Sequence, residues 1–384
     1  MLGLRPTVSA GPAARAGSPA TTLDATNAIR NVEALLEQVL DTRLCQAREV
    51  DPVFAAHVAD RVAGLIRRGG KRLRTAFVWC GWRAAGGSGD TTALWQTGAA
   101  LELLQACALI HDDVMDGAQL RRGGPAVHVE LAGLLGTART TGSSESFGAC
   151  AAVLAGDLAL TWADDLMTET ALRSPHGSRL YDEWRAMRGE MVAGQYRDLY
   201  AQATGSSEVG EALTVATLKS ARYTVERPLT LGASLAGADA RVLDALRSAG
   251  RCAGLAFQLR DDLLGAFGDS SLTGKPVDDD LRSRKLTYLL AVAVELAEAS
   301  GDDAAAEAFA PGAAQRSQLV VERMRAALER TGARAVTESK IAELAAMSLR
   351  HFERTGAEAA VLREFASLLE RATGVALDRT GEHA

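Results

Sequence analysis

Two clusters of aspartates in this sequence could support metal-dependent chemistry. The first lies in residues 106–124, ACALIHDDVMDGAQLRRGG, and contains Asp112, Asp113 and Asp116. On a helix, Asp112 and Asp116 lie on one face with Cβ atoms about 5–6 Å apart, and hard cations such as Mg²⁺ prefer oxygen ligands. An acidic helix end that faces solvent is the alternative. Because carboxylates at a helix C-terminus oppose the helix dipole, the pattern favours a metal site.

The second cluster is Asp261 and Asp262, which end an apolar helical pattern in the stretch QLRDDLLGAFGD, residues 258–269. Alone, this pair would more often be a salt-bridge partner for Arg260 or Arg222. Carboxylates on facing helices of a bundle can, however, hold metal ions across a cavity. The two clusters together therefore predict one site for several Mg²⁺ ions.

Basic residues flank both clusters. Metals held by few carboxylates usually keep positions open for water and substrate phosphate, and Arg and Lys are the side chains that bind phosphate groups. Each one alone would be read as a solvated surface residue. With two aspartate clusters they predict a pocket for diphosphates, lined by Lys71, Arg74, Arg121, Arg122, Lys219, Lys275 and Lys285.

The elements that position these residues are predicted to be helices. Apolar residues recur at three- and four-residue spacing from about residue 26 onward, only nine prolines occur in 384 residues, and no sustained period-2 pattern indicates strands. We expect one all-α domain over residues 26–384, preceded by a disordered tail over residues 1–25. Its first helix is expected to begin at about residue 26, and further helices are expected at 52–66, 77–83, 91–117, 146–171, 180–203, 211–236, 240–267, 285–299, 314–331, 335–350 and 358–373.

The composition of the chain argues against some classes of protein. The formal charge of −6 argues against a nucleic-acid-binding protein. Five scattered cysteines without a CxxC pair indicate free thiols in a reducing compartment, so we expect a cytoplasmic protein. The most apolar stretches, 97–110 and 150–162, are interrupted by polar residues and fall short of about 20 residues, so no stable membrane insertion is expected. The first 23 residues lack the apolar stretch of a signal peptide.

The motifs resemble those of the trans-isoprenyl diphosphate synthases, the polyprenyl synthetase family, and most of all its bacterial-type geranylgeranyl diphosphate synthases. The resemblance implies a single helical bundle of the isoprenoid synthase type around a central cavity, and a homodimer. The matching stretches occur in family order and are GGKRLR (69–74), LIHDDVMDGAQLRR (109–122), KSARYTVERPL (219–229), FQLRDDLLGAFGD (257–269) and GKPVDDDLRSRKLT (274–287).

The resemblance implies a role for each matching residue. Three Mg²⁺ ions would be bound by Asp112, Asp116 and Asp261, supported by Asp113 and Asp262. The allylic diphosphate would be held by Arg121, Lys219 and Lys285, and isopentenyl diphosphate by Lys71, Arg74, Gln105 and Arg122. Ser220 keeps a hydroxyl where the family often has Thr, Lys275 adds a charge to the substrate site, and Phe257 and Gln258 would flank the allylic cation. Catalysis would depend most on Asp112, Asp116, Asp261, Arg121 and Lys219.

The implied reaction is ionisation of the allylic diphosphate, attack by the double bond of isopentenyl diphosphate, and loss of a proton. Side chains below Asp112 would limit the length of the growing tail. In the family, aromatic residues four and five positions before the first aspartate stop the product at farnesyl. Here those positions hold Ala108 and Cys107, with Leu104 in the next layer. We therefore expect geranylgeranyl diphosphate, with a farnesyl or longer product as the alternative.

Two other functions share parts of this pattern. A class I terpene cyclase also carries DDxxD, but it normally needs a second triad of the form (N/D)DxxS/TxxxE, and the stretch 164–172, DDLMTETAL, ends in Leu where the Glu should be. A non-catalytic regulatory subunit would be expected to have lost one aspartate motif, and both are present. One departure from the family pattern is that Ser283 and Arg284 replace the usual Glu-Gly pair before Lys285.

Overall fold

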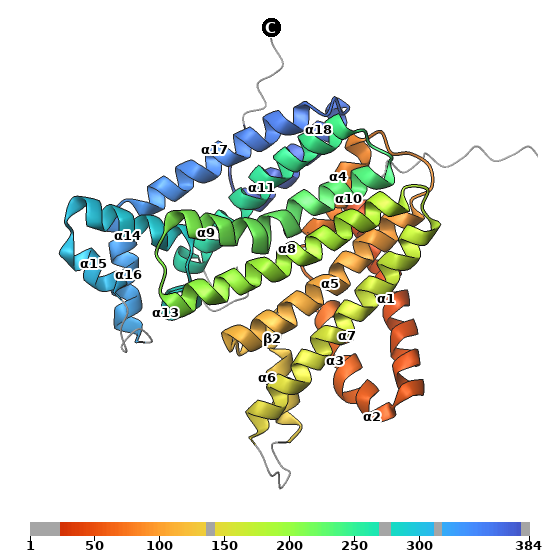
Figure 1. Cartoon of the computed structure of the whole chain (residues 1–384), viewed down its shortest axis with the longest axis horizontal. Coiled ribbons are helices and arrows are strands. Elements are labelled where there is room, and N and C mark those ends of the chain that lie inside the picture. The colour runs from red at the N-terminus through yellow and green to blue at the C-terminus, as the bar shows by residue number, and fades with distance from the viewer. Residues whose placement is uncertain (1–23, 136–142, 269–277, 311–316, 378–384) are drawn as a thin grey trace, which may run out of the picture.

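Helices make up nearly all of the computed structural model, which describes residues 24–135, 143–268, 278–310 and 317–377. They pack as a bundle (Figure 1), so the prediction of an all-α fold is confirmed. In chain order they are α1 (Ala25–Val50), α2 (Pro52–Phe54), the π-helix η1 (Ala55–Ala59), α3 (Asp60–Arg67), α4 (Leu73–Ala84), α5 (Thr92–Asp116), α6 (Val127–Gly133), α7 (Ser144–Arg173), α8 (Gly177–Thr204), α9 (Val209–Ala216), the π-helix η2 (Thr217–Glu226), α10 (Arg227–Leu235), α11 (Ala240–Phe267), α13 (Asp279–Ser283), α14 (Tyr288–Ser300), α15 (Asp303–Phe309), α16 (Gln318–Arg330), α17 (Ala333–Glu353) and α18 (Ala359–Thr373).

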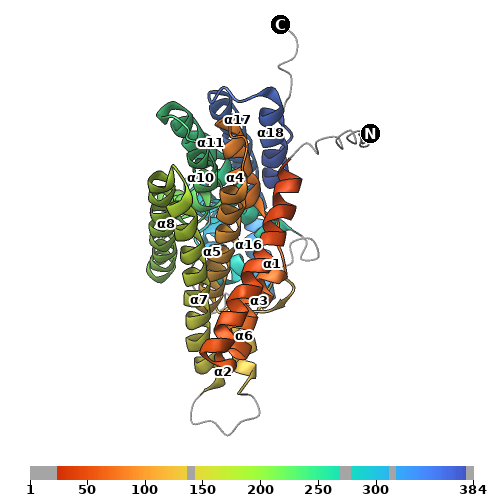
Figure 2. The ribbon, with the colours of Figure 1, turned by 90° about the vertical axis from the view of Figure 1, so that its right-hand side faces the viewer.

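Helix α5 runs through the middle of the bundle and packs against α7, α4 and α1 (Figures 1 and 2). It is apolar on all sides, as expected for a helix enclosed by others, and Leu101, Leu103 and Leu104 are fully buried. Gly117, in the left-handed conformation with φ 65°, ends the helix directly after Asp116. The first aspartate cluster therefore occupies the last turns of the central helix.

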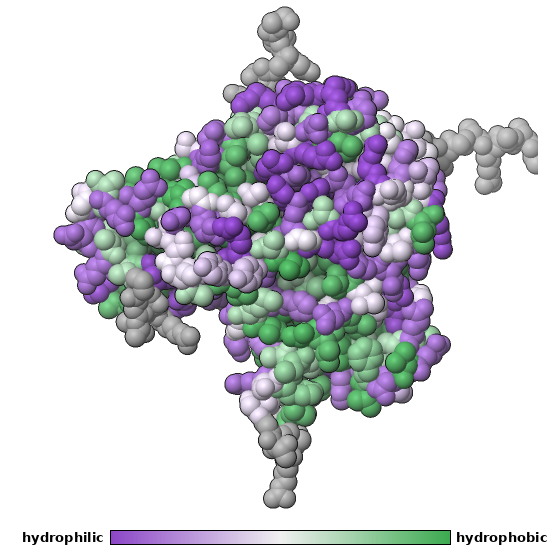
Figure 3. Space-filling model, viewed as in Figure 1, coloured by the Kyte–Doolittle hydropathy of each residue, from purple (hydrophilic) through white to green (hydrophobic). Residues whose placement is uncertain are grey.

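Helices α5 and α7 have the length and hydropathy of membrane-spanning helices. In α5, 67% of the most apolar window is buried inside the bundle, as in the core helix of a globular protein. In α7 the buried share is 44%, which leaves apolar side chains on its outer face, among them Phe147, Val153 and Leu154. Figure 3 shows hydrophobic residues gathered over the part of the surface where α7 lies.

The π-helix η2 is held between α8 and α11 by two glycines. A Cβ atom on Gly194 of α8 would lie 2.3 Å from the backbone nitrogen of Lys219, and one on Gly254 of α11 would lie 2.3 Å from the carbonyl oxygen of Ala221. Pro228, in the first turn of α10, has no N–H to donate at the end of this segment. The wide helical turns thus present Lys219 and its neighbours between two closely packed helices, as π-helical turns often do at functional sites.

A short β-hairpin follows the first aspartate cluster. Strands β1 (Leu120–Arg121) and β2 (Gly124–Pro125) pair antiparallel. The two residues that join them, Arg122 and Gly123, both have positive φ, 52° and 74°, which is the geometry of a two-residue hairpin turn of type I′. These strands were not predicted, since two-residue strands are too short to show a period-2 pattern.

The predicted helix boundaries agree with the structure to within a few residues for most of the long helices. The predicted helix 211–236 is instead three consecutive segments, α9, η2 and α10, and the short helices α6, α13 and α15 were not predicted. Helix α1 begins at Ala25, and the side chain of Asp24 caps it by accepting a hydrogen bond from the backbone N–H of Asn27. The expected tail falls almost wholly on residues 1–23, which lie outside the described residues.

Candidate functional site

Most of the predicted site residues line one cavity at the end of α5. The wall comes mainly from α5, η2 and α11, with further residues from α4, β1, α8, α9, α13 and the start of α14. Because the long helices converge here from distant parts of the chain, residues more than a hundred positions apart share one space. The predicted residues on the lining are Arg74, Gln105, Ala108, Asp112, Arg121, Lys219, Ser220, Gln258, Asp261, Asp262 and Lys285.

The other predicted residues lie around this cavity without lining it. Asp113 is buried behind Arg121, and Asp116, at the end of α5, is exposed to solvent but reaches Lys285. Lys71 is exposed in the turn before α4, and Phe257 packs on the main core. Lys275 lies outside the described residues.

Ion pairs connect Lys219 and Lys285 to aspartates of α5 and α8. Lys219 Nζ lies 2.9 Å from Asp112 Oδ1 and 2.6 Å from Asp198 Oδ2. Lys285 Nζ lies 3.0 Å from Asp116 Oδ2 and 3.5 Å from the same oxygen of Asp198. Asp198, on α8, therefore bridges the two lysines that face the first aspartate cluster.

These pairs keep the site charged at neutral pH. Burial alone would raise the pKa of Asp112, but the charges of Lys219 and Lys285 hold it well below the usual range for a carboxyl group. Burial alone would lower the pKa of Lys285, but Asp198, Asp112 and Asp116 raise it well above its ordinary value. Carboxylates and ammonium groups thus face each other as ions at the cavity wall.

Arg121 and Arg122 are adjacent in the chain but point to different partners. Arg121 Nε donates to Asp113 Oδ1 at 2.7 Å, and its Nη2 donates to the same oxygen and to Asp112 Oδ2 at 3.3 Å. Arg122 sits in the hairpin turn and donates from Nη1 to the Leu65 carbonyl at 3.0 Å. The hairpin therefore separates the two guanidinium groups, one toward the aspartates and one toward the turn before α4.

Three cations at the turn of residues 69–74 have no carboxylate partner among the described residues: Lys71, Arg74 and Arg122. Arg74 stacks on the ring of Tyr223, with Cζ 4.1 Å from the ring centroid, and donates to Thr224 Oγ1 at 3.2 Å. The Arg122 guanidinium lies against Gly70, whose Cβ position is 3.2 Å from Nη2. No ion pair of Arg74, Arg122 or Lys71 occurs in the described chain, so this group of cations can neutralise an anion from outside the protein.

A buried ion pair holds the turn in place. Arg72 has a left-handed backbone with φ 48°, and its Nη1 lies 2.5 Å from Glu102 Oε2 on α5, where both side chains are almost completely buried. Its Nη2 also donates to the Ile66 carbonyl at 3.1 Å. Arg72 thus points into the core, which leaves Lys71 and Arg74 on the other side of the turn.

The second aspartate cluster lies on the opposite wall. Burial and the charge of Asp280 raise the pKa of Asp262 to about 8, although Gln258 Nε2 donates to it at 2.8 Å. Asp261 is exposed beside it and lines the cavity with Asp280. These three carboxyl groups form an acidic part of the cavity wall, where the nearby charge of Lys285 lowers the pKa of Asp262 against the effect of burial.

The carboxylates fit Mg²⁺ as partial ligands. They offer hard oxygen donors from both walls of one cavity, and Asp113 Oδ2 is buried without a hydrogen-bond partner in the described structure. Within the described residues, no three His, Cys, Asp or Glu side chains converge closely enough to hold a metal by themselves. Mg²⁺ is commonly held by one or two carboxylates together with substrate phosphates, which is the arrangement these residues allow.

Of the predicted chain-length residues, Ala108 alone lines the cavity within the described structure. Cys107 is buried and points toward α7: its Sγ lies 3.7 Å from Nδ1 of His111, and His111 Nε2 lies 3.1 Å from the Val153 carbonyl. Leu104 is buried one turn below Ala108. The small side chain of Ala108 therefore leaves the cavity open at this level of α5.

Two acidic residues of this site were not predicted from the sequence. Asp198 continues a buried stripe on α8 that includes Trp184, Met187 and Gly194. A charged residue on the apolar face of a helix is the feature by which Asp198 could have been identified from the sequence. Asp280 stands in a run of three aspartates, and nothing in the sequence distinguishes it from Asp278 and Asp279. Only the packing of α13 against α11 selects it.

Comparisons with known proteins agree with this geometry. The family model described as polyprenyl synthetase matches residues 56–327. A geranylfarnesyl diphosphate synthase from Aeropyrum pernix is 32% identical over 251 residues, 64% of this chain and 74% of the relative. A (2E,6E)-farnesyl diphosphate synthase from Mycobacterium bovis is 36% identical over 219 residues, 57% of this chain and 55% of the relative.

A solved structure covers more of the chain. The crystal structure of geranylgeranyl pyrophosphate synthase from Corynebacterium glutamicum, complexed with isoprenyl diphosphate and magnesium, has a TM-score of 0.85 and 35% identity. The match covers 91% of this chain and 99% of that chain. The similar proteins bear names with different product lengths.

Proposed function

Because the chain belongs to the polyprenyl synthetase family, we propose that it is a prenyltransferase that condenses isopentenyl diphosphate with an allylic diphosphate. The single observation that carries this proposal is the presence of two unlike groups of cations around one cavity. Arg121, Lys219 and Lys285 are paired with aspartates. Arg74 and Arg122 have no carboxylate partner in the described chain. Two diphosphates, one bound with metal ions and one without, would use such a site.

The allylic diphosphate is assigned to the group beside the aspartates. Asp112, Asp116 and Asp261 would hold Mg²⁺, which would supply positive charge to neutralise the departing diphosphate. Lys219 and Lys285 would then exchange part of their contact with the aspartates for phosphate oxygens. These side chains stabilise the departing diphosphate electrostatically in a partly buried site, where such an effect is large.

Isopentenyl diphosphate is assigned to Lys71, Arg74 and Arg122. Guanidinium groups bind phosphate oxygens in a bidentate manner, and Arg74 is already oriented by Tyr223 and Thr224. Gln105 lines the cavity, its Oε1 has no hydrogen-bond partner in the described structure, and it lies about two helical turns before Asp112 on α5. Its amide would help to orient the two substrates so that the double bond faces the allylic carbon.

We further propose geranylgeranyl diphosphate as the main product, since the small Ala108 leaves room below the aspartates. The neighbours bear names with products both shorter and longer. A cytoplasmic location and a homodimer complete the proposal. All five cysteines are free, and the exposed apolar residues of α7 and α8, such as Leu154 and Val192, offer a face for a second copy.

The test is turnover of the purified chain with Mg²⁺, labelled isopentenyl diphosphate and dimethylallyl, geranyl or farnesyl diphosphate, with the products separated by chromatography. We expect geranylgeranyl diphosphate from each primer, and loss of turnover on chelation of the metal. Absence of turnover with every primer would favour a non-catalytic subunit. A hydrocarbon formed from an allylic diphosphate alone would indicate a terpene cyclase.

A further inference from the structure

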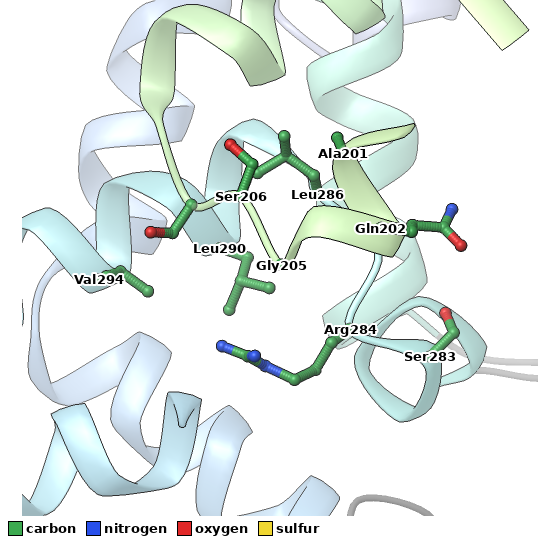
Figure 4. A pocket seen from close by; sticks show the side chains of 10 residues that line it. Ala201, Gln202, Gly205, Ser206, Ser283, Arg284, Leu286, Leu290 and Val294 are labelled. Carbon is green, nitrogen blue, oxygen red and sulfur yellow. The ribbon is translucent and has the colours of Figure 1, made fainter. Parts of the chain in front are cut away.

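A second pocket lies beside the aspartate-lined cavity. It is enclosed by the end of α8 and the loop that follows it, residues 201–207, and by the segment from Ser283 to Leu290 together with Val294 of α14 (Figure 4). Leu286 contributes to both cavities. The second pocket contains no residue to which the proposed function assigns a role.

Arg284 is the charged residue of this pocket, and its backbone is in an unusual conformation. Its φ of 49° lies in the left-handed region, which Gly adopts freely and a residue with a Cβ adopts only at a cost. The neighbouring backbone is held by the bonds from Arg284 N to the Leu281 carbonyl at 3.2 Å and from Lys285 N to the Asp280 carbonyl at 2.9 Å. The left-handed turn directs Lys285 toward the aspartates while Arg284 extends into the second pocket.

The Arg284 guanidinium has no partner in the described structure. Its Nε is buried without a hydrogen bond, and no carboxylate of the described chain forms an ion pair with it, in contrast to Arg121 and Arg325. Figure 4 shows the side chain extending below Leu290 toward Val294. A half-buried arginine normally finds a carboxylate or carbonyl partner, because burial of an unpaired charge is costly.

The rest of the pocket lining offers donors and no competing negative charge. No acidic side chain lines the pocket within the described residues. Ser206 and Ser207 contribute hydroxyl groups at the end of α8, where Gly205 turns the chain with φ 66°. The Arg284 guanidinium fork is suited to the oxygens of a tetrahedral phosphate group, and Ser206 and Ser207 line the same pocket.

We propose that this pocket binds a phosphate-type anion, either inorganic phosphate or diphosphate, with Arg284 as the principal donor. The site is distinct from both groups of cations around the aspartate-lined cavity. The inference goes beyond the proposed prenyltransferase activity and does not depend on it, because the anion would bind whether or not the chain turns over substrate.

The experiment is titration of the full-length chain with inorganic phosphate and, separately, with inorganic diphosphate, in the absence of divalent metal, followed by calorimetry. The wild-type chain is expected to show two classes of site. Arg284→Gly should lose one class, with affinity at that site reduced by about tenfold or more, as for loss of charge-assisted hydrogen bonds. Arg122→Gln should weaken only the other class.

Arg284→Gly also distinguishes loss of anion binding from loss of folding. Because Gly suits the left-handed conformation, its thermal midpoint should equal or exceed that of the wild type. Arg284→Met removes the charge but keeps a Cβ, and should lose the same class of site, whereas Arg284→Lys should retain weakened binding. Unchanged phosphate and diphosphate titrations in Arg284→Gly and Arg284→Met, or loss of every site in Arg122→Gln alone, would overturn the proposal.

Discussion

At the scale of single residues, the cations of the site form two groups: those paired with aspartates, and those without a carboxylate partner in the described structure. Asp198 illustrates the principle, because its carboxylate bridges Lys219 and Lys285 and is almost fully buried. Burial alone would raise the pKa of Asp198, but the charges of the two lysines lower it. Asp198 thereby holds both ammonium groups at the cavity wall in the absence of ligand.

Arg122→Gln tests the assignment of the unpaired cations. The change removes the charge from a side chain that donates to the Leu65 carbonyl and has no ion pair in the described structure, so it leaves no buried carboxylate unpaired. We expect the KM for isopentenyl diphosphate to rise about 10- to 100-fold, as for the loss of one or two charge-assisted hydrogen bonds. The KM for the allylic substrate should change little. Steady-state kinetics with each substrate varied in turn measures both values, and an equal rise in the two would contradict the division.

Ala108→Phe tests which residue limits the product. The phenyl ring would enter the cavity that Ala108 lines and exclude one isoprene unit, whose five carbons are worth about 4 kcal/mol of burial. We expect the main product to shorten to farnesyl diphosphate, measured by chromatography of the labelled lipids.

Cys107→Phe is the matched comparison, because Cys107 points toward α7 and His111. Since its ring would enter the packed contact between α5 and α7, we expect lower stability and a smaller change in product length. If Cys107→Phe shortened the product while Ala108→Phe left it unchanged, the growing tail would have to run on the α7 side of α5.

At the scale of elements, close approach of helix backbones decides where the functional side chains lie. The glycines on α8 and α11 let η2 pack between these two helices. Farther along the same helices, Arg227 of α10 and Arg247 of α11 both pair with Glu183 of α8. Small residues and ion pairs therefore act together to hold η2 between its neighbours.

Gly254→Ala should displace η2, since the added methyl group would lie 2.3 Å from the Ala221 carbonyl oxygen. We expect a loss of about 1–3 kcal/mol in the free energy of unfolding, as for other overpacked cores, and a fall in kcat because Lys219 moves. Gly189→Ala on α8 is the control, because no atom lies within 4 Å of its Cβ position, and it should be neutral or stabilising by up to about 1 kcal/mol. Denaturant unfolding of the two variants decides whether the packing constraint is real.

Glu183→Gln tests the ion pairs by their pH dependence. Burial alone would raise the pKa of Glu183, but hydrogen bonds and charges from Arg247 and Arg227 lower it. Because the pKa of Glu183 is lower in the native state than in the unfolded state, its ionisation stabilises the fold at pH values above the ordinary glutamate pKa of about 4.3. This contribution is lost as the pH falls through the native pKa. We expect the variant to be about 3 kcal/mol less stable than the wild type at pH 7, with a smaller difference at pH 3.5.

Asp182→Asn is the control for this measurement. Asp182 pairs with Arg185 on the exposed face of α8, and an exposed pair contributes about 0–1 kcal/mol. Urea unfolding at both pH values should therefore give nearly the same stability for Asp182→Asn and the wild type. A Glu183→Gln deficit that did not shrink at low pH would mean that packing, and not charge, is lost.

At the scale of the whole molecule, the outer faces of α7 and α8 are the surface proposed to bind a second copy of the chain. Exposed apolar residues lie on both helices, including Phe147 and Leu154 of α7 and Val192 of α8, and hydrophobic residues gather where α7 lies (Figure 3). Exposed apolar patches often mark an association site. In the proposed homodimer a second copy would bury this face, next to the helices that carry Asp198 and support η2.

Leu154→Arg should weaken the proposed dimer, because burying an unpaired charge at an apolar interface is costly. Sedimentation velocity is expected to show a monomer, or a dissociation constant raised by about tenfold or more, corresponding to at least 1.4 kcal/mol. Leu319→Arg on α16 is a matched control, since Leu319 is similarly exposed, 58% against 61% for Leu154, and it should leave the mass unchanged. A wild-type chain that sediments as a monomer would remove the homodimer from the proposal.

The sequence by itself determined the all-α class, the long helices and the chemistry of the site. These follow from local properties: apolar periodicity over many residues, Asp24 and Gly117 at helix ends, and two aspartate clusters accompanied by basic residues. Such signals need no knowledge of distant contacts. Most of the predicted residues line one cavity because they occupy regular positions on long helices, where spacing along the chain sets direction.

Only the tertiary structure decided which charges meet. Asp198 and Asp280 join the site through packing between elements far apart in sequence, and the hairpin turn at Arg122 separates two arginines that are adjacent in the chain. The π-helical form of η2 depends on close contact with Gly194 and Gly254, and Cys107 faces α7 because of how the two helices are rotated. These features arise from long-range contacts, which local patterns of residues do not specify.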